Sequence, residues 1–196
     1  MKNTMLGILG GLMVLAPGTA RSDEMDRFAV ELVPGASFAT EDLADADLGT
    51  GLGADLTVGV RFLPHLWAYG GWGWRRFSAD MSFAGPNIDA EETGYSLGVR
   101  FEHPFNGPAT PAFMLRAGAT YTHIEIENAG GAMMMDSGHG LGWEAATGVA
   151  FRMRDHWRLT PGVRFRSLKR DFDLDATTTP ATLRYISAEV GLSRTF

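Results

Sequence analysis

Apolar and polar residues alternate along most of the chain from Phe28 onward. Between Leu52 and Phe62 the even-numbered residues are all apolar, while the odd-numbered ones are Gly, Asp, Thr or Arg. Side chains on a strand point to opposite faces in turn, so this alternation predicts a strand with one apolar and one polar face. The same pattern predicts eight strands, at residues 28–38, 52–62, 66–77, 94–102, 112–122, 141–152, 157–167 and 184–196.

The segments that connect these strands alternate in length. The short ones are 63–65, 103–110 and 153–156, and the long ones are 39–51, 78–93, 123–140 and 168–183. Helical periodicity does not occur between the strands, so antiparallel hairpins are expected. All short turns then fall at one end of the sheet and all long loops at the other, which a soluble sandwich does not require.

The apolar face carries aromatic residues near both ends of most strands. About eight to ten residues separate the two aromatic positions of a strand, which corresponds to about 20–25 Å in a tilted strand and matches the apolar band of a membrane barrel. A soluble eight-stranded barrel would place its apolar face inside, whereas this banding favours an apolar outer face in lipid. The predicted aromatic girdles comprise Phe28, Phe38, Phe62, Trp72, Trp74, Tyr95, Phe101, Phe113, Tyr121, Trp143, Phe151, Trp157, Phe165 and Phe196.

The polar face combines small residues with charges at the middle of the strands. Eight strands enclose an interior that side chains just fill, so these charges are expected to pair with one another in the lumen. The turns place Glu144 near Arg164 and Arg166, and Glu189 near the same arginines. The predicted ionic network, which we interpret as structural, comprises Glu31, Asp55, Arg61, Arg100, Arg116, Glu144, Arg164, Arg166 and Glu189. A narrow, gated pore is the alternative interpretation of this polar face.

The first twenty residues have the layout of a secretory signal peptide. Lys2 provides a positive start, Met5–Leu15 is a short apolar stretch, and small residues at Gly18-Thr19-Ala20 precede the expected cleavage. The apolar stretch is about half as long as a membrane-spanning helix requires. We therefore expect residues 1–20 to be a signal peptide and residues 21–196 to be one β-barrel domain outside the cytoplasm.

Composition excludes several classes of protein. No run of 18 or more apolar residues occurs, which argues against a helical membrane protein. The chain has no cysteine, so it is not a disulfide-stapled module. Its 17 Lys and Arg against 23 Asp and Glu argue against a nucleic-acid partner.

Glycine-aromatic strands and the last residues of the chain resemble a known family. The resemblance rests on Gly70-Gly71-Trp72-Gly73-Trp74, the terminal Gly191-Leu192-Ser193-Arg194-Thr195-Phe196 and the strand pattern over about residues 26–196. They resemble the outer-membrane β-barrel domain family of small eight-stranded barrels, of the OmpA-transmembrane and OmpX kind. The resemblance implies an all-β, antiparallel, up-and-down transmembrane barrel in the outer membrane of a Gram-negative cell. It also implies that Phe196 is an assembly signal for the insertion machinery, although Arg194 stands where an apolar or aromatic residue is usual.

The four long loops are acidic. Their acidic residues are Glu41, Asp42, Asp45, Asp47, Asp80, Asp89, Glu91, Glu92, Glu125, Glu127, Asp136, Asp171, Asp173 and Asp175. Blocks of like charge usually form a solvated surface. Asp42, Asp45 and Asp47 have the residue type of a Ca²⁺ site, but no EF-hand spacing supports one.

The third long loop contains residue types that could carry chemistry. Ser137 and His139, with His123 across the hairpin, have the residue types of an acyl-transfer site or a metal site. However, Ser137 follows the flexible run Met133–Met135 and lacks a rigid shell, so a lipid-modifying hydrolase is only a minor alternative. The three methionines suit either an exposed contact surface or burial against the barrel rim.

Taken together, the sequence predicts an outer-membrane barrel with a charge-filled lumen, and a role in envelope structure or surface interaction. We expect it not to be an enzyme and to have no cofactor, no metal and no catalytic residue. The expected partners are outer-membrane lipid, lipopolysaccharide, the assembly machinery and a possible surface partner that binds the loops. A small porin-like channel for ions or solutes is the alternative function.

Overall fold

The computed structural model describes residues 27–196, apart from 45, 83–84, 107–109, 155 and 175–176. The expected signal peptide, residues 1–20, lies outside the described residues. In the described part of the chain, no helix has the length and apolar character needed to cross a membrane.

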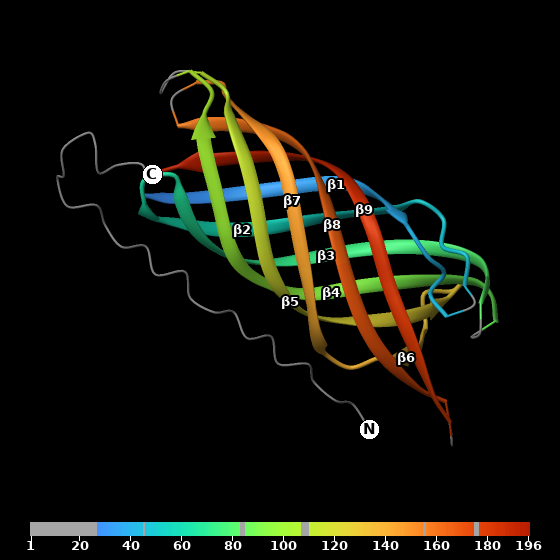
Figure 1. Cartoon of the computed structure of the whole chain (residues 1–196). Helices are drawn as coiled ribbons and strands as arrows, with labels where there is room; N and C mark the ends of the chain where they lie inside the picture. Colours follow the sequence, from blue (N-terminus) through green and yellow to red (C-terminus); the bar gives the residue numbers. More distant parts are fainter. Residues whose placement is uncertain (1–26, 45, 83–84, 107–109, 155, 175–176) are drawn as a thin grey trace, which may run out of the picture.

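The described residues form a closed antiparallel barrel (Figure 1). The strands are β1 (Phe28–Ala39), β2 (Gly51–Leu63), β3 (Leu66–Ser82), β4 (Gly85–Pro104), β5 (Ala112–Asn128), β6 (Met133–Asp136), β7 (Gly140–Arg152), β8 (Trp157–Leu174) and β9 (Thr177–Thr195). Eight long strands pair with their neighbours, and the pairing of β1 with β9 closes the ring. The short strand β6 pairs with β5 alone. The predicted eight-stranded all-β fold is confirmed, with β6 as an addition inside the third long connection.

The strands extend further at the long-hairpin end than the sequence analysis predicted. β3 and β4 remain paired as far as Ser82 and Gly85, and β8 and β9 as far as Leu174 and Thr177. The predicted loops 78–93 and 168–183 are therefore mostly strand, and this part of the prediction was wrong. The cause is that alternation continues in both segments but with its apolar residues on the opposite face.

This reversal of the pattern builds an apolar core inside the long-hairpin end. From Phe77 on β3 and Leu168 on β8, the inward positions become mostly apolar, with the buried Arg170 as an exception, and the Phe77 and Leu168 side chains are fully buried. The core comprises Leu43, Ala46, Leu48, Phe77, Ala79, Ile88, Ala90, Ile124, Ile126, Leu168, Phe172, Ala181, Leu183 and Tyr185. Its first three members come from the connection between β1 and β2, which folds inward. This end of the barrel thus follows the rule of water-soluble proteins, with apolar side chains inside.

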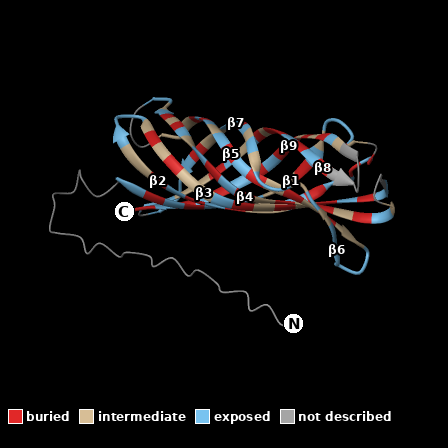
Figure 2. Cartoon of the chain, turned by 90° about the horizontal axis from the view of Figure 1, so that it is seen from below, coloured by how far each residue is buried: buried red, intermediate tan, exposed pale blue. Residues whose placement is uncertain are grey.

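The middle of the barrel follows the opposite rule. Figure 2 shows exposed and buried residues alternating along the strands, and the exposed ones in this zone are largely apolar. Trp72, Tyr95 and Tyr121 are register partners across β3, β4 and β5, so they form one aromatic row on the outer face. The other predicted girdle residues also lie at exposed or partly exposed outward positions. Arg194 lies between two of them, with its guanidinium 5.8 Å from the Trp157 ring and 4.9 Å from the Phe196 ring.

A glycine slot holds one aromatic side chain inside the barrel. Gly98 and Gly118 are register partners on β4 and β5, and the Tyr69 ring reaches across them from β3. A Cβ atom on Gly98 would lie 2.6 Å from Tyr69 Oη, and one on Gly118 would lie closer still. The Tyr69 hydroxyl donates a hydrogen bond of 2.7 Å to Glu144, so the ring is held where it is.

Substitution Gly118→Ala is expected to destabilise the barrel by about 1–3 kcal/mol, because the added methyl group displaces Tyr69. Gly70→Ala is the matched control, since its Cβ would lie 3.8 Å from the nearest atoms and is expected to change stability by less than about 0.5 kcal/mol. Denaturant unfolding of both variants in detergent micelles measures the difference. Equal stability of the two variants would show that the slot is not tight.

Candidate functional site

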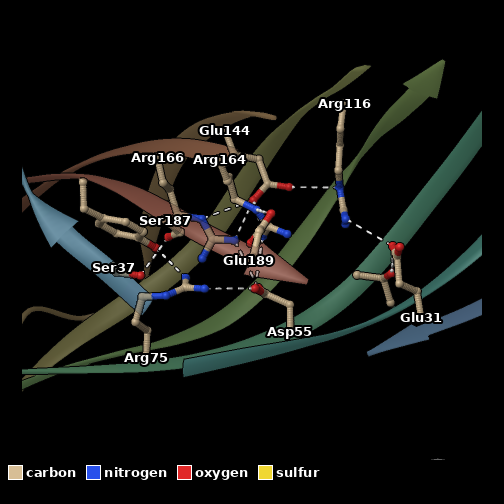
Figure 3. Close-up of polar contacts among 12 residues, drawn as sticks. Glu31, Ser37, Asp55, Arg75, Arg116, Glu144, Arg164, Arg166, Ser187 and Glu189 are labelled. Carbon is tan, nitrogen blue, oxygen red and sulfur yellow. Dashed lines mark hydrogen bonds and ion pairs between the residues drawn. The ribbon is translucent and has the colours of Figure 1, made fainter. Parts of the chain in front are cut away.

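Two carboxylates at the centre of the lumen form ion pairs with arginines from several strands (Figure 3). Asp55 on β2 lies 3.2 Å from Arg75, 3.1 Å from Arg164 and 3.2 Å from Arg166. Glu144 on β7 lies 2.5 Å from Arg166 and 3.2 Å from Arg164. All five side chains are almost fully buried. Since Asp55 and Glu144 stand on different strands and share two arginines, the ion pairs join separate parts of the barrel wall.

The network continues toward the apolar core. Arg166 Nη1 donates to Glu92 over 3.0 Å, and the Tyr185 hydroxyl donates to the same carboxylate over 2.5 Å. Arg75 in turn donates to Tyr185 Oη over 2.8 Å. Tyr185 is itself a member of the apolar core, so the core and the charged layer are in direct contact.

A second group of contacts lies toward the short-turn end. Glu31 accepts from Arg100 over 3.3 Å and lies 3.6 Å from Arg116. Arg116 also lies 3.5 Å from Glu144 and covers the Tyr69 ring at 3.7 Å, which connects this group to the central one.

The structure brings most of the predicted network residues into contact. Glu189 pairs with Arg164 over 3.0 Å, as the turns suggested, whereas Arg166 turns to Asp55, Glu92 and Glu144. Arg61 lies apart from the central group, with its guanidinium 5.0 Å from the Trp67 ring centroid.

Several members of the network were not assigned to it from the sequence. They are Tyr69, Arg75, Glu92, Glu102, Arg158 and Tyr185. Their signal was the inward position of each on its strand. Glu92 was missed because the strand was predicted to begin at Gly94, so Glu92 was counted as a loop acid, although the structure buries it.

The outer wall above the aromatic row carries opposed carboxylates. Glu125 on β5 is the register partner of Glu91 on β4 and of Asp136 on β6. His123, Glu125 and Asp136 each offer a ligand atom, and these atoms lie within 4.8 Å of one another. Among described residues, this is the one arrangement with a histidine that could hold a metal. The His139 ring stacks on His123 with centroids 4.5 Å apart.

The hydroxyl of Ser137, the candidate nucleophile, makes both of its hydrogen bonds to backbone groups. Its hydroxyl accepts from Ile124 N over 2.9 Å and donates to the Gly138 carbonyl over 3.0 Å. The hydroxyl proton is therefore directed at a carbonyl rather than at a general base.

The remaining loop residues divide between two environments. Met133 and Met134 are exposed, whereas Met135 packs against the apolar core, so the run of methionines is divided between an exposed and a packed part. Of the three aspartates considered for Ca²⁺, Asp45 lies outside the described residues. Asp42 and Asp47 are exposed.

Comparison with known proteins agrees with this geometry. The family model described as outer membrane protein beta-barrel domain matches residues 8–196. Neisserial surface protein A has a similar structure, with a TM-score of 0.62 and 17% identity, covering 86% of this chain and 97% of that one. OprG from Pseudomonas aeruginosa gives a TM-score of 0.54 and 12% identity, covering 88% and 97%. A major outer membrane protein from Thermus thermophilus gives 0.51 and 14%, covering 87% and 98%. No curated protein sequence matches the chain.

Substitution Glu144→Gln is expected to destabilise the barrel by about 3–5 kcal/mol, because it leaves buried arginines without their full complement of negative charge. Glu41→Gln makes the same chemical change at an exposed pair with Arg184 and is expected to cost at most about 1 kcal/mol. Denaturant unfolding in lipid vesicles compares the two. A loss for Glu144→Gln no larger than that for Glu41→Gln would contradict a central role for this carboxylate.

Substitution Glu125→Gln is expected to stabilise the barrel by about 0.2–1 kcal/mol, because it relieves repulsion from the carboxylates on both neighbouring strands. The same Glu41→Gln variant is the control, since it should move stability in the opposite direction. The melting temperature of both variants at low ionic strength checks the sign. A destabilised Glu125→Gln would mean that this carboxylate is already neutralised in the native state.

Proposed function

Because the chain belongs to the outer membrane protein β-barrel domain family, we propose that it is a non-conducting, non-enzymatic barrel that acts in envelope structure and at the cell surface. Its location is the bacterial outer membrane. By the usual arrangement of such barrels, the short-turn end is periplasmic and the long-hairpin end is extracellular.

The observation that carries the proposal is the filling of the lumen. Buried ion pairs link β2 and β7 to β8 at the centre, and the apolar core lies above them on the extracellular side. An ion on the barrel axis would have to break contacts of Asp55, Glu144 and Arg166, and would then meet an apolar layer. Both steps are costly in a medium of low dielectric constant.

If the lumen does not conduct, the extracellular hairpins are the surface available for function. Their apolar core supports paired strands that rise above the aromatic row, so they present fixed outer walls rather than free loops. These walls carry carboxylates, and their apolar side chains Met81, Met133 and Met134 are exposed. Charged and flexible apolar groups on a supported surface suit contact with another envelope or surface component.

We propose two further partners from the same surfaces. The acidic wall at Glu91 and Glu125 lies just above the aromatic row, at the level of lipopolysaccharide head groups, where divalent cations would link carboxylates to phosphates. Phe196 has an exposed ring at the periplasmic edge, and its backbone N–H donates to Phe28 O over 2.8 Å. An exposed terminal aromatic ring at this edge is accessible to the assembly machinery, which we propose recognises it.

Refolded protein in a planar bilayer is expected to show no steady openings, because the ion pairs and the apolar core both cross the ion path. Insertion is verified by heat-dependent migration on a denaturing gel. Steady wild-type openings whose amplitude changes in Glu144→Gln but not in Glu41→Gln would place conduction in the lumen. That result would replace the proposal with the small-channel function.

A further inference from the structure

The periplasmic end of the lumen contains a cavity of about 230 Å³. We define the basic vestibule as this cavity with its lining residues Arg61, Trp67, Glu102, Arg152 and Arg158. Pro64 and Pro104 complete part of its apolar wall. A water molecule occupies about 30 Å³ of liquid, so the vestibule has room for a group several times larger.

Arginines oppose one another across the strands at this end. Arg152 on β7 and Arg158 on β8 are direct register partners, and both line the cavity. One layer deeper, Arg100 and Arg116 are register partners on β4 and β5. Like charges directly opposite each other in a sheet are destabilising. Two such pairs in one part of the lumen indicate that negative charge is needed there.

The carboxylates described near the basic vestibule do not supply enough negative charge to balance these arginines. Glu102 lies 2.7 Å from Arg158 and 3.2 Å from Arg100, so it is shared between two arginines. Glu31 is likewise shared between Arg100 and Arg116, and Arg116 also lies 3.5 Å from Glu144. Arg152 makes no ion pair with any carboxylate in the part of the chain that the structure describes. The vestibule therefore carries a surplus of positive charge.

We infer that the basic vestibule binds a small phosphate-type oxyanion that enters from the periplasmic side. The planar guanidinium donates pairs of parallel hydrogen bonds that match the oxygens of phosphate, and Arg152 and Arg158 face the cavity from adjacent strands. Trp67 is almost fully buried at its inner wall, and such an apolar wall lowers the local dielectric constant and strengthens the attraction. An oxyanion between the two arginines removes their mutual repulsion.

Two sources could supply the same chemistry. A free phosphate or phosphate monoester could diffuse in from the periplasm, or the head group of an anionic phospholipid could reach in from the inner leaflet. The vestibule recognises the oxyanion in both cases, so the two sources differ only in how the ligand arrives.

Titration calorimetry with inorganic phosphate tests the site on the refolded chain in zwitterionic detergent at low salt. Saturable binding is expected, and Arg152→Gln is expected to weaken it on the order of tenfold, the loss of one charge-assisted contact. Arg154→Gln is the matched control. It removes the same charge two residues away, where Arg154 lies with Met153, Trp157 and Leu192 on a different surface. Arg152→Lys, which keeps the charge but not the planar fork, is expected to weaken binding less than Arg152→Gln.

Absence of saturable phosphate binding would overturn the inference, and so would an equal loss in Arg152→Gln and Arg154→Gln, which indicates diffuse attraction. Heat-dependent gel migration confirms that each variant is folded. Repeating the titration in phosphatidylglycerol vesicles and in phosphatidylcholine vesicles separates the sources. Phosphate binding lost only with phosphatidylglycerol assigns the site to a lipid head group, while equal binding in both assigns it to a free phosphate. Either result supports an oxyanion site.

Discussion

The ion pairs that Asp55 and Glu144 make with Arg164 and Arg166 are the contacts on which the rest of the barrel depends. A strand that crosses lipid must turn its apolar side chains outward, which leaves polar groups to fill a narrow interior. Charges confined there are tolerable only if each is paired and hydrogen-bonded. The shared arginines meet this condition and join strands that are not neighbours in the sheet. Tyr69, which the glycine slot accommodates, and Tyr185 donate further hydrogen bonds to the buried carboxylates of Glu144 and Glu92.

The fold was predictable because its main signal is local. Alternation with a period of two identifies a strand and its two faces from the residues of that strand alone, as between Leu52 and Phe62. Short turns then set the pairing register, which is why Glu144 could be placed near Arg164 and Arg166 from the sequence, and the structure pairs it with Arg166.

The predictions that failed depended on long-range information. Alternation persists beyond Phe77 and Leu168, but only the closed barrel shows that most inward positions become apolar there, with Arg170 as an exception. The burial of Glu92 depends on Arg166 and Tyr185, which are distant in sequence, and no local pattern reports such a contact. Arg152 and Arg158 face each other across the short turn between β7 and β8, which is a local feature. The charge surplus around them appears only when the surrounding carboxylates, which come from distant strands, are assigned to their partners.

The apolar core above the aromatic row has a thermodynamic consequence. Its side chains are withdrawn from water, so opening this end of the barrel exposes apolar surface to solvent and raises the heat capacity. Residues on the lipid-facing band exchange protein contacts for hydrocarbon and carry little of this effect. The two zones of one continuous sheet therefore respond differently to temperature. On cooling, the hydrophobic stabilisation of the long-hairpin end weakens, whereas the ion-paired centre depends less on this effect.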